Sequence, residues 1–169
     1  PKENIYIVTN DLYKDLVLEQ LDVTADQALC EPSRRNTAPC IAYANYKIAT
    51  KNPNANIIVA PADHLILKED KFVEVMTTAL DYTEANNALV TLGIQPSRPD
   101  TGYGYIQFDD SGQSPIKKVK TFTEKPDLTL AKQFLDSGDF SWNSGMFIWS
   151  LSSINDSFEK LLPEMDALF

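Results

Sequence analysis

Short apolar runs alternate with longer amphipathic segments, and this alternation most constrains the fold. Four apolar runs have the length of buried strands, at residues 5–8, 28–32, 57–61 and 88–93. Between them lie segments with helical spacing of apolar side chains, at 11–21, 37–50 and 70–86. Strands that alternate with helices usually form a parallel sheet covered on both faces. The sequence therefore predicts an α/β fold, with a mostly parallel mixed sheet flanked by helices.

The second half of the chain departs from this alternation. Two strand-like segments, 103–108 and 116–122, flank the polar turn 109–112 and predict a hairpin. A helix at 128–135, a strand at 140–149 and a closing helix at 151–169 are expected to follow.

Length and charge limit the classes of protein to consider. The 169 residues suit one domain, and a net charge of −9 disfavours a broad nucleic-acid surface. No apolar run is long enough to span a bilayer, and the first residues lack the layout of a secretion signal. Two cysteines are too few for a disulfide scaffold. We therefore expect a cytoplasmic protein with neither nucleic acid nor membrane as a partner.

The richest motif lies between residues 121 and 149. Glu124 and Lys125 follow an apolar strand and precede a proline, and Asn143-Ser144-Gly145 interrupts the next strand. A carboxylate can accept hydrogen bonds from sugar hydroxyls, and an ammonium can bind a phosphate. The motif indicates a sugar-phosphate site. The alternative is a solvated charge pair ahead of a turn.

A second motif, Pro61-Ala62-Asp63-His64, follows the clearest central strand. Ligands of open α/β sheets sit at the carboxyl ends of the strands, where Asp63 could hold Mg²⁺ against phosphate oxygens. The alternative is that Asp63 caps the next segment and His64 makes a local hydrogen bond.

Two further motifs are weaker. Residues 31–39 link a strand to a helix, so Asn36 and Thr37 could contact the edge of a base, although their chemistry alone favours a helix cap at Thr37. Gly102 and Gly104 permit a close approach of a ligand to the backbone. A bend or bulge at the start of a strand explains these glycines equally well.

Taken in order, the motifs EPSRRNTAP, PADH, TGYGYI, FTEKP and WNSGMFIW resemble those of the sugar nucleotidylyltransferases, and within them the mannose-1-phosphate guanylyltransferases. The resemblance covers almost the whole chain. It implies a Rossmann-like nucleotidyltransferase fold and the reaction of GTP with mannose 1-phosphate to give GDP-mannose and pyrophosphate. It also implies Mg²⁺ as the cofactor.

The resemblance assigns roles to individual residues. Asp63 and Lys125 are the implied catalytic residues, with Asp63 as the metal ligand and Lys125 on the sugar phosphate. The remaining residues are implied to bind substrate: Arg35, Asn36, Thr37 and Ala38 the guanine, Gly102 and Gly104 the sugar through their backbone, and Glu124, Asn143 and Ser144 the sugar pocket.

The sequence also departs from the family. The family's Gly-rich loop for the triphosphate is missing, since no glycine precedes Gly93, and so is a later segment that supplies a second metal carboxylate. We therefore expect residues 1–169 to be part of a nucleotidyltransferase catalytic domain that does not turn over alone. Whether the full-length protein forms a homo-oligomer is left open.

Other functions stay open at this point. One is nucleotidyl transfer to another sugar 1-phosphate, and another is a non-catalytic subunit with the same fold. The missing G-x-G-x-x-G motif disfavours a dinucleotide oxidoreductase.

Overall fold

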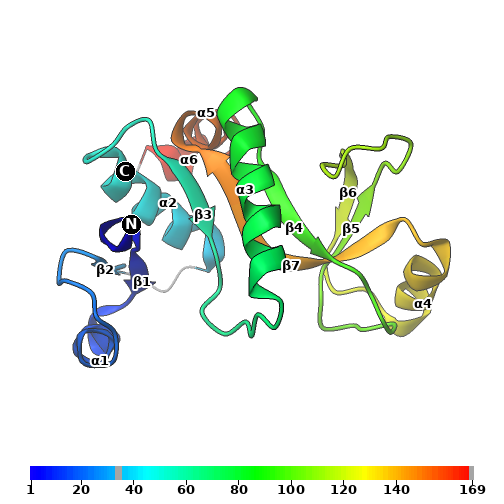
Figure 1. The fold of residues 1–169 in the computed structure, drawn as a ribbon, viewed down its shortest axis with the longest axis horizontal. Coiled ribbons are helices and arrows are strands. Elements are labelled where there is room, and N and C mark those ends of the chain that lie inside the picture. The colour runs from blue at the N-terminus through cyan, green and yellow to red at the C-terminus, as the bar shows by residue number, and fades with distance from the viewer. Residues whose placement is uncertain (33–35, 168–169) are drawn as a thin grey trace. The chain divides into compact units, whose positions relative to one another are not determined.

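The computed structural model describes residues 1–32 and 36–167, which belong to two compact units. Unit 1 comprises Pro1–Ala55 and Leu151–Phe169, and unit 2 comprises Asn56–Ser150. The elements of unit 1 are η1 (Lys2–Asn4), β1 (Ile7–Thr9), η2 (Asp11–Tyr13), α1 (Lys14–Gln20), β2 (Ala28–Cys30), α2 (Thr37–Ala49), α5 (Leu151–Leu161) and α6 (Pro163–Asp166). The elements of unit 2 are β3 (Asn56–Val59), α3 (Glu69–Ala85), β4 (Val90–Ile94), β5 (Tyr105–Phe108), β6 (Val119–Thr123), α4 (Leu128–Ser137) and β7 (Phe140–Ser150) (Figure 1).

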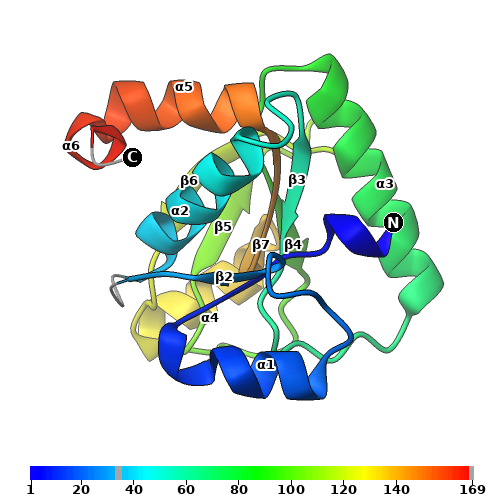
Figure 2. The ribbon, with the colours of Figure 1, turned by 90° about the vertical axis from the view of Figure 1, so that its left-hand side faces the viewer.

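In unit 1, β1 and β2 form a parallel two-stranded ladder, and α1 precedes β2 in the chain (Figure 2). The buried side chain of Gln27 supports the ladder, because its amide donates to the carbonyls of Lys2 and Ile5, at 2.8 Å each. Burying an amide stabilises a fold only when such partners are present.

The closing helix predicted at 151–169 is wrong in its extent. Helix α5 ends at Leu161, and α6 is a separate short helix that begins at Pro163. Proline has no N–H to continue the helical hydrogen bonds, and its ring disfavours a helical conformation of the residue before it. Leu162 accordingly has φ −136° and ψ 52°.

The five-stranded sheet of unit 2 is organised by β7. This strand pairs with β3, β4 and β5, and β6 pairs with β5. The α/β class, with a mixed sheet and flanking helices, is confirmed. Antiparallel pairing is more frequent than the sequence indicates, because β7 runs opposite to all three of its neighbours. The parallel ladder of the described residues is the one between β1 and β2.

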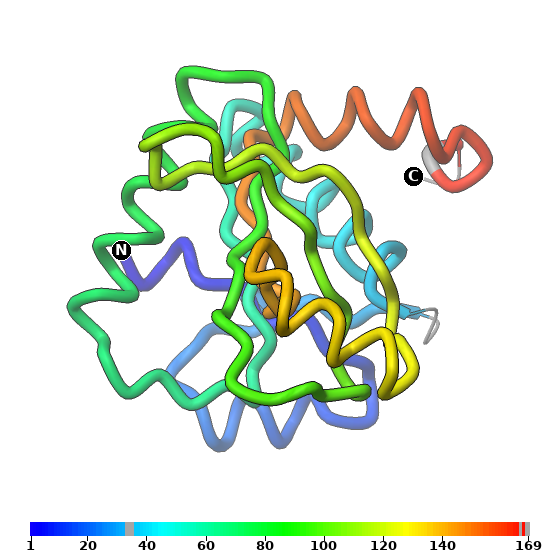
Figure 3. The backbone as a smooth tube through the Cα atoms, turned by 90° about the vertical axis from the view of Figure 1, so that its right-hand side faces the viewer, coloured from blue at the N-terminus to red at the C-terminus, as the bar shows by residue number. Residues whose placement is uncertain are grey.

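Two hydrophobic clusters stabilise unit 2, and both include side chains of β7. Helix α3 packs along the sheet and contributes Met76 and Ala79, which join Met146 and Ile148 (Figure 1). At the other end of β7, Trp142 packs with Tyr105 of β5 and Ala131 of α4, which are both fully buried. The β5–β6 hairpin and α4 lie at this end of the strand (Figure 3). Side chains of β7 are thus packed in a hydrophobic cluster toward each end of the strand, which restricts movement of the residues between them.

Among the described residues, none of the helices combines the length and apolar character needed to cross a membrane.

Candidate functional site

The motif Asn143-Ser144-Gly145 forms a bulge in the middle of β7. The β4–β7 ladder pairs Gly93 with Asn143 and Thr91 with Phe147, so residues 144–146 of β7 lie opposite Leu92 alone. Gly145 has φ +72°, a conformation that residues with a Cβ adopt only with strain. Extra residues of this kind locally bend a strand and redirect its side chains.

Hydrogen bonds within the bulge fix its side chains. The Ser144 hydroxyl donates to the carbonyl of Leu92 at 2.7 Å and accepts from the Met146 N–H at 3.1 Å. The Asn143 side-chain oxygen accepts from the Gly145 N–H at 3.1 Å. The hydroxyl hydrogen of Ser144 is therefore already used, and a contact of Ser144 with a sugar stays a prediction.

Three of the predicted sugar-site residues are neighbours, because Glu124 and Asn143 both lie against Gly104. The Asn143 N–H donates to the Gly104 carbonyl at 2.8 Å. A Cβ at position 104 would lie 3.1 Å from Oε2 of Glu124 and 3.7 Å from Cβ of Asn143. A side chain at this position would press on the carboxylate end of the exposed Glu124 side chain, which would have to shift by a few tenths of an ångström. Close approach of a ligand to the Gly104 backbone stays a prediction.

Lys125 has an unusual backbone conformation. Its φ is +36°, and the other described non-glycine residue with positive φ is Asn36, at +68°. Such conformations are costly for residues that carry a Cβ, and they concentrate at functional sites. Both residues fall within sequence motifs that were predicted to bind substrate. The Lys125 ammonium lies 3.7 Å from Oε1 of Glu124.

The loop before β5 is held by residues that the sequence analysis did not single out. Asp100 accepts from the Gly102 N–H at 2.7 Å and pairs with Arg98 at 2.5 Å. The Gly102 N–H, and then Arg98, lower the pKa of the Asp100 carboxyl. The Tyr105 hydroxyl donates to the Asp100 carbonyl at 2.9 Å. These bonds fix the position of Gly102.

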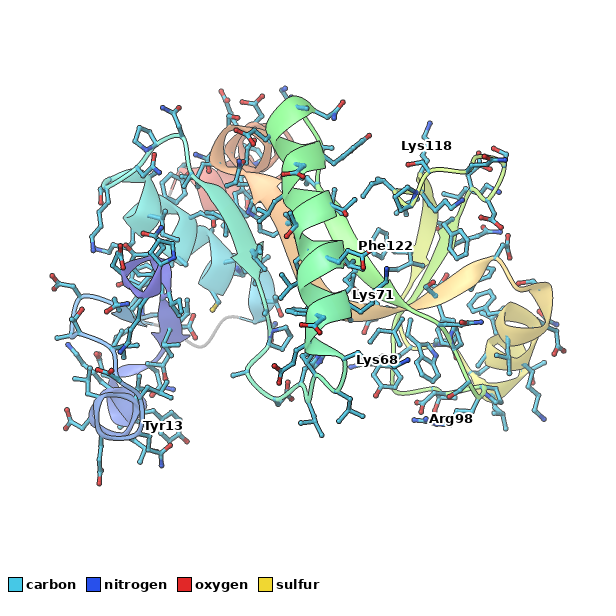
Figure 4. All side chains as sticks on the ribbon, viewed as in Figure 1. Tyr13, Lys68, Lys71, Arg98, Lys118 and Phe122 are labelled. Carbon is cyan, nitrogen blue, oxygen red and sulfur yellow. The ribbon has the colours of Figure 1, made fainter. Side chains whose placement is uncertain are left out.

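Arg98, labelled on this loop in Figure 4, also lies over the ring of Trp142, 5.2 Å from its centroid. The Tyr103 ring stacks on Trp142, with centroids 4.9 Å apart. Trp142 is part of the core, with 6% of its surface exposed. Its place directly before Asn143 links the core to the candidate site.

Asp63 lies in the loop after β3. Its side chain is 89% exposed and, within the described residues, its single ion-pair contact is to Nε2 of His64 at 4.0 Å. The same loop approaches the β7 bulge, because a Cβ on Gly145 would lie 3.4 Å from Cγ of Pro61. The motifs PADH and WNSG are therefore neighbours in space.

The fit of Asp63 to a metal can be judged from its chemistry. The described residues contain no group of three or more His, Cys, Asp or Glu side chains that could enclose an ion. Mg²⁺ does not need such a cage, since it commonly binds one or two carboxylates, several waters and the phosphates of a substrate. An exposed, weakly paired Asp63 fits that role as one ligand.

The predicted guanine-binding residues belong to unit 1. Asn36 occupies the N-cap position of α2, with ψ −171° and no cap hydrogen bond from its side chain, and Thr37 and Ala38 begin the helix as exposed residues. The N-cap of this helix was predicted at Thr37, but the structure has it one residue earlier, at Asn36. Arg35 lies outside the described residues. The exposed side chains of Asn36 and Thr37 leave polar groups available to a ligand.

A groove of about 910 Å³ also lies in unit 2, between α3, β4 and the β5–β6 hairpin. Lys71 and Lys118, both labelled in Figure 4, line it with mostly apolar neighbours such as Val75 and Ile116. None of the predicted site residues lines this groove. We therefore place the candidate site where Glu124 and Asn143 contact Gly104, and not in this groove.

Comparison with known proteins places the chain in a family. The profile of the nucleotidyl transferase family matches residues 2–168, and the chain belongs to that family. It is 40% identical, over 168 residues, to a mannose-1-phosphate guanylyltransferase of Escherichia coli. It is 39% identical, over 168 residues, to the mannose-1-phosphate guanylyltransferase RfbM of Salmonella typhimurium. These alignments cover 94% and 96% of this chain but 36% and 35% of the relatives, so the chain spans about a third of their length.

Solved structures show the same fold. The crystal structure of a mannose-1-phosphate geranyltransferase from Thermus thermophilus superposes with a TM-score of 0.89 at 26% identity, covering 99% of this chain and 48% of the other. A mannose-6-phosphate isomerase from Helicobacter pylori superposes with a TM-score of 0.81 at 30% identity, covering 96% of this chain and 61% of the other. The fold class expected from the sequence is thereby confirmed.

Proposed function

We propose that the protein transfers GMP from GTP to mannose 1-phosphate, giving GDP-mannose and pyrophosphate. The observation that supports this best is the chain of contacts through unit 2. Pro61 lies against Gly145, and the Asn143 N–H donates a hydrogen bond to the Gly104 carbonyl. Gly104 in turn lies against the Glu124 carboxylate. Four motifs that are separate in sequence thus lie next to one another, which supports a single site. The relatives in Escherichia coli and Salmonella typhimurium are mannose-1-phosphate guanylyltransferases, which supports the choice of substrates.

In the proposed reaction, a phosphate oxygen of mannose 1-phosphate attacks the α-phosphorus of GTP. A new P–O bond forms in line with the α–β anhydride bond, which breaks to release pyrophosphate. The attacking oxygen is already ionised at neutral pH, so no general base is required. The protein's task is to position two anions and to offset their repulsion.

The site residues divide this task. Glu124 accepts from sugar hydroxyls, Asn143 and the backbone of Gly104 orient the ring, and the Lys125 ammonium binds the sugar 1-phosphate. Asp63 would hold Mg²⁺, which when bound neutralises charge on the reacting phosphates. Residues 35–38 would line the guanine pocket. On this proposal, residues 1–169 are part of a cytoplasmic catalytic domain.

The direct test measures pyrophosphate release by the protein in its full native length. GTP, ATP and dTTP are each paired with mannose 1-phosphate and glucose 1-phosphate, with and without Mg²⁺. We expect the highest kcat/KM for GTP with mannose 1-phosphate, and no turnover without a divalent cation. A preference for another pair would assign the protein to a different sugar nucleotidylyltransferase. No turnover with any pair would favour a non-catalytic subunit.

A further inference from the structure

Thr91 of β4 contacts the candidate site, although no motif includes it. It is partly buried and pairs with Phe147 on the far side of the β7 bulge. Its hydroxyl lies 3.0 Å from the carbonyl oxygen of Met146 and 3.3 Å from Oδ1 of Asn143. Thr91 is 52 residues before Asn143 in the sequence, so only the fold brings them together.

The orientation of the Asn143 carboxamide follows from its neighbours. The Gly145 N–H points at one end of this group, at 3.1 Å, and an N–H can only donate. That end must therefore be the oxygen, and the hydroxyl of Thr91 faces the same atom. The NH₂ group at the other end has no hydrogen-bond partner among the described residues, which leaves both of its hydrogens for a ligand.

We propose that Thr91 is a positioning residue for sugar recognition. Its single hydroxyl hydrogen is shared between the Met146 carbonyl oxygen at 3.0 Å and Oδ1 of Asn143 at 3.3 Å. With the Gly145 N–H, this shared bond keeps the Asn143 oxygen directed at the bulge, so that the amide NH₂ donates to an oxygen of the sugar 1-phosphate. This inference rests on the proposed function, and it specifies that Asn143 is the donor in its hydrogen bond to the sugar 1-phosphate. Thr91 itself does not touch the sugar.

The neighbouring carboxylate supplies the complementary half of the contact. An ionised Glu124 can only accept hydrogen bonds, whereas the Asn143 NH₂ can only donate. Both side chains flank Gly104, where a Cβ would lie 3.1 Å from Oε2 of Glu124 and 3.7 Å from Cβ of Asn143. A sugar hydroxyl both donates and accepts, so adjacent hydroxyls of a hexose match this donor–acceptor pair.

The test compares Thr91→Val with Thr91→Ser in the protein at full native length. Valine keeps the shape and removes the hydroxyl, whereas serine keeps the hydroxyl. We expect Thr91→Val to lower kcat/KM for mannose 1-phosphate by about three- to tenfold, the value of one neutral hydrogen bond. Thr91→Ser should restore most of this loss, and KM for GTP should stay within about twofold of the wild type.

Thr83→Val is the matched control. Thr83 is a buried threonine of α3 whose hydroxyl also donates to a backbone carbonyl, that of Leu80 at 3.0 Å. Its replacement should change the melting temperature without changing kcat/KM for mannose 1-phosphate. If Thr91→Val fails to fold, Thr91→Ala replaces it in the comparison with Thr91→Ser.

Two further measurements separate positioning from packing. In a double-mutant cycle, Thr91→Val should have little additional effect once Asn143→Ala is present, because Thr91 acts through Asn143. Asn143→Asp keeps the shape but removes both donors, so it should lower kcat/KM for mannose 1-phosphate more than Thr91→Val does.

The outcomes distinguish the two proposals. Additive effects of the Thr91 and Asn143 variants, a fully active Asn143→Asp, or an unchanged kcat/KM in Thr91→Val would each overturn the role given to Thr91. Failure of Thr91→Ser to restore activity would do the same. A wild-type protein that never uses mannose 1-phosphate would overturn the proposed function, and this inference with it.

Discussion

The two sides of the candidate site differ in how firmly the protein holds them. On the sugar side, Ser144 donates to the Leu92 carbonyl of β4, and Asn143 accepts from the Gly145 N–H within the bulge. On the metal side, Asp63 is 89% exposed, and His64 lies 4.0 Å away. The bulge residues of the proposed sugar side are therefore shaped by the fold, whereas Asp63, like Lys125, is left open to a ligand.

Replacing Asp63 gives the sharpest test of the metal side. Asp63→Asn should lower kcat by roughly 100-fold or more, because a ligand of the phosphate-bound cation is lost. The free energy of unfolding should hardly change, since the side chain is exposed. Steady-state rates and urea unfolding measure the two effects. Normal turnover in Asp63→Asn would remove Asp63 from the site.

Lys125 belongs to the sugar side but is exposed like Asp63. Lys125→Ala should weaken binding of mannose 1-phosphate by about 1.5–3 kcal/mol, the value of a hydrogen bond to a charged group. Calorimetric titration or KM measures this loss. Lys132→Ala removes an equivalent charge from an exposed position of α4 and serves as the control. If only the response to GTP changed, the role assigned to Lys125 would be wrong.

Gly145 tests whether the bulge must keep its shape. Gly145→Ala should destabilise the protein by roughly 1–2 kcal/mol, because alanine is strained at φ +72° and its Cβ would contact Pro61. It should also lower kcat/KM for mannose 1-phosphate. Gly138, with φ +77° and open space around it, is the matched control. Gly138→Ala should lower stability without lowering kcat/KM, and a similar loss of kcat/KM in both variants would contradict the role of the bulge.

The smallest predicted effect concerns pH. The Gly102 N–H and Arg98 lower the pKa of Asp100, so its ionised form stabilises the fold above the ordinary value of 3.8. That contribution is lost as the pH falls through the lowered pKa. Asp100→Asn should therefore show a shallower loss of stability below about pH 5 than the wild type does. Urea unfolding at several pH values, with Asp136→Asn as the control, measures this; equal slopes would exclude the effect.

The sequence predicted the elements better than their connections. Strand-length apolar runs located β1 to β4, and helical spacing located α3, whose buried residues are Met76, Ala79 and Thr83. The partners of β7 were not predictable, because strand pairing depends on contacts far apart in sequence. The break between α5 and α6 follows from Pro163, because proline disfavours a helical conformation of the residue before it.

The candidate site was predictable in part. The motifs identified Gly104, Glu124 and Asn143, which the fold brings together. The positive φ of Lys125 was not predictable, because lysine has no preference for that conformation. Thr91 was also missed, since a lone threonine in an apolar strand is ordinary until its partner across the ladder is known.

One strand, β7, passes through both hydrophobic clusters of unit 2, with the bulge between them. Its amide hydrogens can exchange with solvent only when tightly packed side chains at both ends separate. If the proposed sugar site is correct, the part of it on β7 should lose its shape only when unit 2 itself opens.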